Sequence, residues 1–221
     1  MRKKANPKIL KDIYNRLFRY FGPRNWWPGE TPFEVIVGAI LTQNTAWANV
    51  EKAIQNLKEE GLMLPEKLFH LRQERLASLI RPAGYFNIKS QRLKSFLAFL
   101  FSSYQGRLNK MFRSETVILR EELLKVKGIG PETADSILLY AGGKLTFVVD
   151  AYTRRIFSRY GLIDGKASYH QIQTIFYQNL PHQVQLFNEY HALLVELGKT
   201  ICRKKPNCPA CPLKTECLKI F

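Results

Sequence analysis

Hydrophobic residues recur at spacings of three and four along most of this chain, and the runs that they form end at glycine or proline. The pattern is clear in residues 6–22, 32–61, 66–84, 87–106 and 169–180. Such spacing places the apolar side chains on one face of an α-helix. The stretch LTFVVD (145–150) has a β-like composition, but with no partner strand in view we expect a short extended link into the next helix. The pattern predicts an all-α protein.

Residues 123–138, LLKVKGIGPETADSIL, contain two helical runs joined by a turn that has no polar side chain. Gly128 and Gly130 allow a positive φ and bring no side chain, so the amides of the turn and of the next helix can point outward together. Outward amides at a helix N-terminus bind anions, and Lys125 and Lys127 add positive charge nearby. The alternative is an ordinary helical hairpin whose glycines only end one helix.

The charge of the chain is strongly positive, because 34 Lys and Arg stand against 18 Asp and Glu, giving a net charge of +16 over 221 residues. The basic residues are spread along the chain, which favours nucleic acid as the partner. A generally basic surface or an anionic membrane is the alternative. No apolar segment follows the basic start and no run of about 18 apolar residues occurs. We therefore expect no membrane partner and a cytoplasmic, nucleoid-associated protein.

The cysteines are confined to the last 20 residues, in the pattern C-x5-C-x2-C-x5-C. A secreted disulfide framework is not usually distributed in this way, so the four thiols indicate one metal site. Thiolates at this spacing can ligate a [4Fe–4S] cluster or tetrahedral zinc, and spacing alone does not separate the two. The predicted ligands are Cys202, Cys208, Cys211 and Cys217.

Several of these motifs together resemble one family. LLKVKGIGPETADSILLYA, followed shortly by FVVDAYTRRIF, resembles the helix-hairpin-helix and Gly/Pro-Asp loop of the endonuclease III superfamily of DNA glycosylases. CRKKPNCPACPLKTEC resembles the iron–sulfur loop of many members, with five residues instead of six in its first gap. WWPGETPFEVIVGAILTQNTAWANVEKAIQNLK and IRPAGYFNIKSQRL resemble the endonuclease III-like 3-methyladenine DNA glycosylases in particular. The resemblance spans roughly residues 26–217 and favours the [4Fe–4S] cluster over zinc.

The resemblance implies a two-lobed helical fold. Residues 28–143 would form a helical barrel that contains the hairpin. Residues 1–27 and 144–221 would form a second helical domain that holds the cluster loop. The expected partner is double-stranded DNA with a damaged base, bound in the cleft between the lobes by a monomeric enzyme.

The resemblance also implies how the enzyme reaches a base. It must extrude the nucleotide from the duplex, at a cost of a few kcal/mol of unstacking. Gln43 lies where family members insert a glutamine into the vacated stack, and Tyr85 and Phe86 lie where they wedge the opposite strand. Without the resemblance, we would interpret Gln43 as a polar residue in a turn between helices and the two aromatic residues as part of the core. The hairpin turn and the lysines beside it are expected to contact the DNA phosphates. These residues are Lys125, Lys127, Gly128, Ile129 and Gly130.

The extruded base needs a pocket, and all three tryptophans lie near the expected insertion loop. A 3-alkylated adenine is cationic, so indole faces would attract it more strongly than they attract ordinary adenine. The alternative is that at least one indole belongs to the core. Trp26, Trp27 and Trp47 are therefore the pocket candidates, with Trp27 and Trp47 as the expected walls.

The chemistry depends on two positions. Bifunctional members carry a lysine nucleophile two residues after the second hairpin glycine, and here that position is Glu132, which cannot form a Schiff base. Asp150 matches the carboxylate of the Gly/Pro-Asp loop, which can stabilise an oxocarbenium ion or activate water. An Asp at this place is also a common helix N-cap.

The predicted function is a monofunctional DNA N-glycosylase that removes alkylated purines such as 3-methyladenine. The alternatives are a bifunctional glycosylase with AP lyase activity, a glycosylase for mismatched or oxidised bases, and a DNA-binding module without catalysis.

Overall fold

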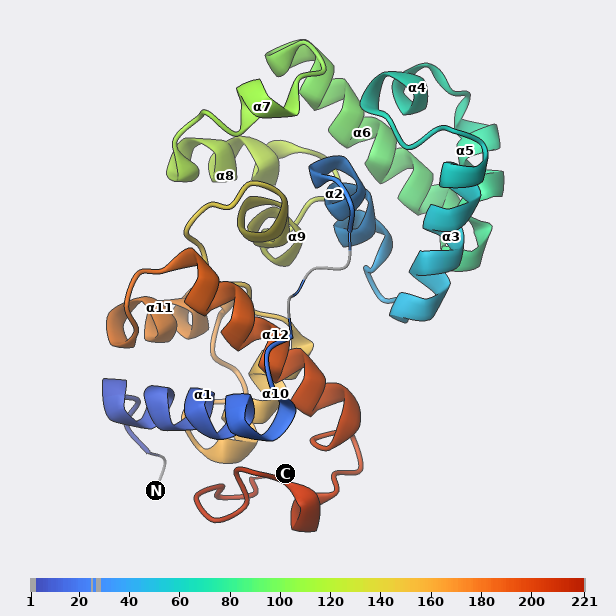
Figure 1. Cartoon of the computed structure of the whole chain (residues 1–221). Coiled ribbons are helices and arrows are strands. Elements are labelled where there is room, and N and C mark those ends of the chain that lie inside the picture. Colours follow the sequence, from blue (N-terminus) through green and yellow to red (C-terminus); the bar gives the residue numbers. More distant parts are fainter. Residues whose placement is uncertain (1–2, 25, 27–28, 221) are drawn as a thin grey trace. The chain divides into compact units, whose positions relative to one another are not determined.

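Short helices joined by turns make up the molecule, as the hydrophobic pattern predicts (Figure 1). The computed structural model describes residues 3–24, 26 and 29–220. Within these residues the secondary structure consists of α-, 3₁₀- and π-helical segments without a β-strand. Residues 145–150 form the expected extended link into the following helix. The all-α prediction is confirmed.

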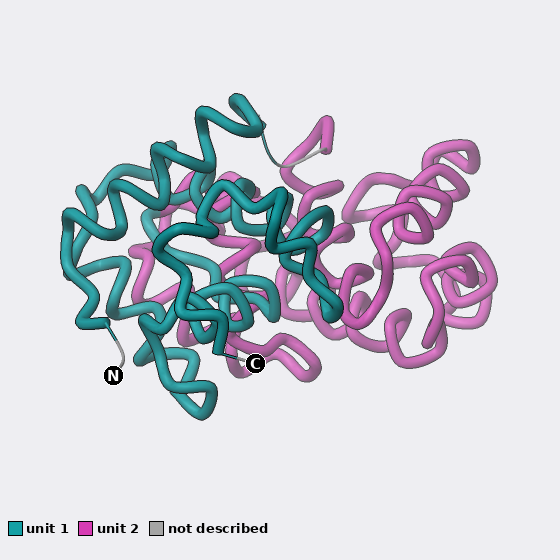
Figure 2. The backbone as a smooth tube through the Cα atoms, turned by 90° about the horizontal axis from the view of Figure 1, so that it is seen from below, with its two compact units in different colours: residues 1–27, 145–221 teal, residues 28–144 magenta. Residues whose placement is uncertain are grey.

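The chain divides into two compact units (Figure 2). Residues 28–144 form one of them, called here the central unit, and residues 1–27 together with 145–221 form the other, the terminal unit. The chain therefore leaves the terminal unit after its first helix and returns to it through the link that precedes Asp150.

The central unit is built around a helix that is apolar on all sides. In α2 every residue from Phe33 to Leu41 is buried, and such a helix needs neighbours all round. It packs against α3, α6, α9 and the π-helix η2. The helices of this unit are α2 (Pro32–Leu41), α3 (Trp47–Glu59), α4 (Pro65–His70), α5 (Gln73–Leu79), η1 (Arg81–Ala83), α6 (Phe86–Tyr104), α7 (Leu108–Met111), α8 (Thr116–Lys125), α9 (Pro131–Ser136) and η2 (Ile137–Ala141).

The terminal unit has an aromatic core. Phe147, in the extended link, stacks on Phe176 with 3.5 Å between ring centroids, and Phe187 and Tyr190 meet it edge-on. The buried Tyr190 hydroxyl donates to the carbonyl oxygen of Leu10 at 2.9 Å. Its helices are α1 (Pro7–Phe21), α10 (Ala151–Tyr160), α11 (Tyr169–Asn179), α12 (Val184–Thr200) and η3 (Cys208–Ala210). Helix α12 packs against both α10 and α1.

Side chains cap several helix N-termini, which explains where these helices begin. Asn6 Oδ1 accepts from the Ile9 amide at 3.0 Å, and Thr31 Oγ1 accepts from the Glu34 amide at 3.1 Å. Ser168 forms a reciprocal capping box at the start of α11. Each cap satisfies an amide that the helix leaves without an internal partner. Asp150 plays the same part at the start of α10.

Candidate active site and DNA-binding elements

The hairpin is formed by α8, α9 and the turn between them, in the central unit. Gly128 adopts a φ of +89°, whereas Gly130 has a φ of −96°, so only Gly128 uses the positive φ that glycine allows. A Cβ at Gly130 would have no atom within 4 Å, so the space in front of it is open. Ile129 is 4% exposed and its side chain belongs to the core. Only the backbone of Ile129 can therefore meet a ligand.

A bidentate ion pair joins the two helices of the hairpin. Arg120 of α8 donates to both carboxylate oxygens of Asp135 in α9, at 2.7 and 2.9 Å. Asp135 is fully buried, and this fork geometry satisfies both of its oxygens. The pair links α8 to α9 across the turn. Lys125 and Lys127 are exposed beside that turn.

Gln43 lies in the loop between α2 and α3, and its side chain contacts the hairpin. Its amide nitrogen donates to the Gly128 carbonyl oxygen at 3.1 Å and to the Thr133 hydroxyl at 2.9 Å. Arg92 of α6 donates to its amide oxygen. The structure thus brings Gln43 and the hairpin turn together. Arg92 lies in no recognisable motif, so the sequence did not predict it as a partner of Gln43.

Tyr85 and Phe86, at the start of α6, have different surroundings. Tyr85 is 70% exposed and has the left-handed φ of +47°, which is uncommon for a residue other than glycine. Phe86 packs against the core of the central unit, with the Arg81 guanidinium 5.8 Å from its ring centroid. Only Tyr85 has the exposure that a wedge requires.

The described tryptophans have different surroundings. Trp47 begins α3, packs partly buried against the central core, and donates from Nε1 to Glu51 at 2.6 Å. Trp26 belongs to the terminal unit, where the Lys199 ammonium lies 5.0 Å from its ring centroid. Trp27, the other expected wall, lies outside the described residues.

Asp150 caps α10 and also meets a histidine. Its Oδ1 accepts from the Thr153 amide at 2.7 Å, while His191 Nε2 of α12 lies 3.6 Å from Oδ2. Both side chains are largely buried, at 11% and 5% exposure. The N-cap interpretation of Asp150 is confirmed. His191 was missed in the sequence, because a single histidine on an apolar helix face carries no signal of its partner.

Three influences set the charge state of Asp150. Burial by itself raises the pKa of Asp150, but the electrostatic interaction with His191 and the hydrogen bond from the Thr153 amide outweigh it. The pKa of Asp150 therefore lies below its ordinary value. The arrangement keeps a carboxylate ionised in a largely dry place, where a fixed negative charge acts strongly on a developing cation.

The other end of α10 holds the cysteine loop. Arg155 donates to the carbonyl oxygens of Gly198 and Cys202 at 3.0 and 2.8 Å. Arg159 Nη1 lies 3.5 Å from Cys202 Sγ, and the Cys217 thiol lies 3.4 Å from the Arg159 carbonyl oxygen. One helix thus carries Asp150 at its N-terminus and braces the cysteine loop with its last turns.

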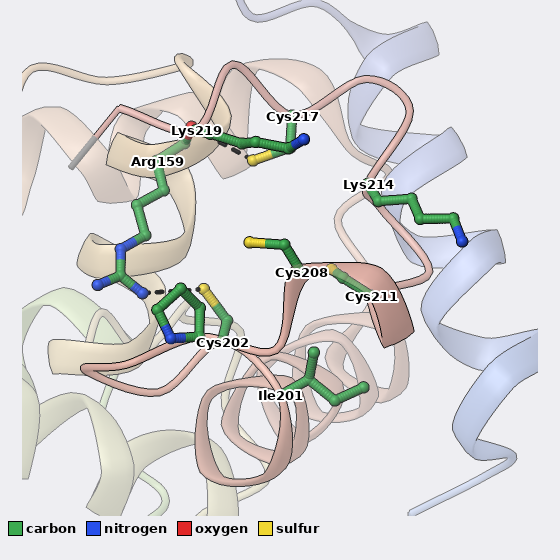
Figure 3. A pocket seen from close by; sticks show the side chains of 9 residues that line it. Arg159, Ile201, Cys202, Cys208, Cys211, Lys214, Cys217 and Lys219 are labelled. Atoms are coloured by element: carbon green, nitrogen blue, oxygen red, sulfur yellow. Dashed lines mark hydrogen bonds between the residues drawn. The ribbon is translucent and has the colours of Figure 1, made fainter.

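The four cysteines line one cavity in the terminal unit (Figure 3). Burial is the main cause that raises the pKa of the Cys211 and Cys217 thiols. Among the described residues, no group of three or more His, Cys, Asp or Glu side chains is placed to hold a metal ion. The four cysteine side chains nevertheless line the same space.

The comparisons with known proteins identify the family. Residues 37–182 match the family model described as HhH-GPD superfamily base excision DNA repair protein. A Methanocaldococcus jannaschii protein, provisionally named as a DNA repair glycosylase, is 51% identical over 96% of both chains. Endonuclease III of Thermotoga maritima is 29% identical over 95% of this chain and 92% of its own. The chain belongs to the HhH-GPD superfamily and is a base excision repair DNA N-glycosylase.

Solved structures share the fold. The 3-methyladenine DNA glycosylase of Helicobacter pylori, bound to 1,N6-ethenoadenine, has a TM-score of 0.77 and 29% identity, covering 89% of this chain and 98% of its own. Endonuclease III in a trapped covalent complex with DNA has a TM-score of 0.84, with 97% and 96% coverage. Its identity of 23% shows the fold alone. Within the part of the chain that the structure describes, no helix is both long and apolar enough to span a membrane.

Replacing His191 with glutamine should raise the pKa of Asp150, because burial then acts with less opposition. A carboxyl ¹³C NMR titration of labelled aspartate measures the shift. His182→Gln is the matched control, since His182 is an exposed histidine of the same unit that contacts the Tyr177 carbonyl oxygen. An unchanged Asp150 titration in His191→Gln would mean that the Thr153 amide alone keeps the carboxylate ionised.

Proposed function

We propose that this glycosylase is monofunctional and removes alkylated purines such as 3-methyladenine from double-stranded DNA, acting as a monomer. The observation that carries the proposal is Glu132. It stands exposed in the first turn of α9, at the position where bifunctional relatives would carry the lysine nucleophile. A carboxylate cannot form a Schiff base with the sugar, so the lyase route of those enzymes has no nucleophile there.

Asp150 is proposed to provide the catalytic carboxylate. Loss of the base builds positive charge on the deoxyribose, and an ionised carboxylate close to it lowers the energy of that state. The Thr153 amide fixes Oδ1, and His191 lies beside Oδ2, so the group is oriented before DNA arrives. The same carboxylate can accept a proton from the water that captures the sugar cation.

The choice of alkylated purines rests on the base and on a relative. An alkylated purine such as 3-methyladenine is already cationic, so it leaves readily and gains cation–π attraction at an indole face. Trp47, which follows the Gln43 loop directly, is the proposed wall in the central unit. The Helicobacter pylori enzyme with 29% identity is itself a 3-methyladenine glycosylase, bound to an alkylated adenine derivative.

DNA is proposed to be held and opened from the central unit. The hairpin backbone at Gly128 and Gly130 would meet phosphate, with Lys125 and Lys127 beside it. Gln43 would fill the space left by the extruded base, and Tyr85 would wedge the opposite strand. Because Gln43 is bonded to the hairpin in the free protein, the same turn that grips phosphate also orients the inserting amide.

The four cysteines are proposed to hold a [4Fe–4S] cluster. The support is that the four thiols line one shared cavity and that the loop resembles the iron–sulfur loop of the superfamily, which favours a cluster over zinc. The cluster would supply a rigid cross-link for the C-terminal loop. That loop carries cations that face solvent for the DNA backbone: Arg203, Lys204, Lys205 and Lys214.

A bifunctional, endonuclease III-type enzyme is the second candidate function. Its support is the 29% identity with Thermotoga maritima endonuclease III across nearly the whole chain. It would require another amine near the sugar, with Lys127 and Lys144 as the nearest in sequence to the hairpin helix.

The product of the reaction separates the two candidates. A duplex that contains one 3-methyladenine should yield free base and an intact strand that breaks only after alkali treatment, and borohydride should trap no protein–DNA adduct. A trapped adduct would assign lyase chemistry to an amine of this chain. Release of oxidised or mismatched bases in place of 3-methyladenine would refute the substrate class.

Asp150→Asn separates catalysis from helix capping, because asparagine caps a helix about as well as aspartate but carries no charge. The variant should remain folded at the assay temperature and keep its affinity for damaged DNA. Single-turnover excision should fall by roughly a hundredfold or more, the usual effect of losing one preorganised charge interaction. Asp12→Asn, which changes a partly exposed carboxylate paired with Arg16, is the control. Excision by Asp150→Asn at the parent rate would leave Asp150 as a cap only, with Glu132 the next carboxylate to test.

The metal prediction concerns colour and content. Protein purified without oxygen should be yellow-brown and contain iron and sulfide, and Cys211→Ser should lose both. Lys214→Gln, which alters a side chain of the same cavity without removing a sulfur, should keep them. A colourless protein with one bound zinc would overturn the cluster assignment.

A further inference from the structure

Lys89 is a fully buried lysine in the first turn of α6, with 1% of its surface exposed. Its ammonium group donates three hydrogen bonds. The acceptors are the Leu41 carbonyl oxygen at 2.7 Å, the Ala83 carbonyl oxygen at 2.8 Å and the Thr45 hydroxyl at 2.5 Å. All three donors of the group are thereby used.

Burying an ammonium group is costly even when it is fully bonded. Burial, with a smaller contribution from the nearby Arg92, lowers the pKa of Lys89 to about 8. A hydrophobic residue would fill this place without that cost. The function of the lysine therefore has to be sought in what its three bonds join.

The acceptors lie at two separate connections of the central unit. Leu41 ends α2 and Thr45 lies in the loop that follows, so the two bracket Gln43. Ala83 ends η1, two residues before Tyr85. Thr45 also donates directly to the Ala83 carbonyl oxygen at 2.7 Å, which closes the network. Lys89 thus ties the loop that carries Gln43 to the loop that carries Tyr85.

We propose that Lys89 is a positioning residue that fixes the Gln43 loop and the Tyr85 loop relative to each other, so that both side chains enter the duplex together. This rests on the proposed function, in which those two residues fill and wedge the opened base stack. Extrusion of a base costs a few kcal/mol, and loops that are already ordered add no further ordering cost at that step.

The chain provides a matched control in Lys94. It lies on the same helix, and its ammonium group also donates to three backbone carbonyl oxygens, those of Leu68, Phe69 and Leu71. Burial lowers its pKa as well. Its three acceptors lie at the C-terminus of α4, away in sequence from both loops. Lys94→Met therefore removes an equivalent set of bonds without touching Gln43 or Tyr85.

The test compares Lys89→Met with Lys94→Met at temperatures where both are folded. A duplex with 2-aminopurine opposite a tetrahydrofuran abasic analogue reports insertion by its fluorescence, whatever damaged base the enzyme prefers. Two further measurements are made on both variants: single-turnover excision of 3-methyladenine and binding to undamaged duplex. Lys89→Met should lose most of the fluorescence change and excise at least roughly tenfold more slowly than Lys94→Met, since a misplacement of about 1 Å can cost about a hundredfold. Undamaged-duplex binding should match in the two variants.

Equal insertion and excision by Lys89→Met and Lys94→Met would overturn the positioning role and leave only a contribution to stability. If the parent enzyme itself gives no insertion signal, the proposed roles of Gln43 and Tyr85 fail, and the proposal for Lys89 fails with them. Thr45→Val serves if Lys89→Met does not fold, because it removes one acceptor of the Lys89 ammonium and the Thr45–Ala83 bond while the two carbonyl acceptors of Lys89 stay in place. It should reduce insertion in the same direction, and parent-like insertion by Thr45→Val would count against the proposal.

Discussion

The peptide groups at helix ends must find hydrogen-bond partners, and this requirement shapes both units of the protein. A fold of short helices leaves many carbonyl oxygens without an internal partner. Long basic side chains supply the donors, as Lys89 does for the end of α2, Lys94 for α4 and Arg155 for α12. At a helix N-terminus the need is for an acceptor, and Asp150 accepts a hydrogen bond from the Thr153 amide of α10. Lys89, proposed to position the two loops that open DNA, and Asp150, the proposed catalytic carboxylate, therefore also complete helices.

Local patterns in the sequence were enough for the helices and for the family. The apolar spacing predicted α1, α6 and α11 closely, because each has one face on a core and begins or ends at a recognisable residue. The hairpin motif and the Asp150 cap are also local, since they depend on neighbours within a few positions. The two hairpin glycines look alike in the sequence, but Gly130 has a φ of −96° where Gly128 has a positive φ. The extended backbone of Gly130 needs no glycine, so its conformation gives no reason for the residue.

The rest of the candidate site could not be predicted, because it depends on contacts between distant helices. His191 contacts Asp150 because α12 packs on α10. Arg92 contacts Gln43 because α6 packs against α2. Neither residue stands in a motif that marks its partner. Phe86 shows the converse, because it is adjacent to the exposed Tyr85 but is turned into the core. Side-chain direction at a helix start follows from packing, which a periodic pattern does not contain.

The internal use of basic side chains changes what the net charge of +16 means for DNA binding. Affinity for the phosphate backbone comes from the release of condensed counterions, and only cations that reach phosphate release them. Lys89 is buried, and Lys94, Arg120 and Arg155 are engaged with acceptors of the protein itself. The dependence of binding on salt should accordingly exclude these four of the 34 basic residues. Their charges add to the net charge and complete the fold without adding contacts to phosphate.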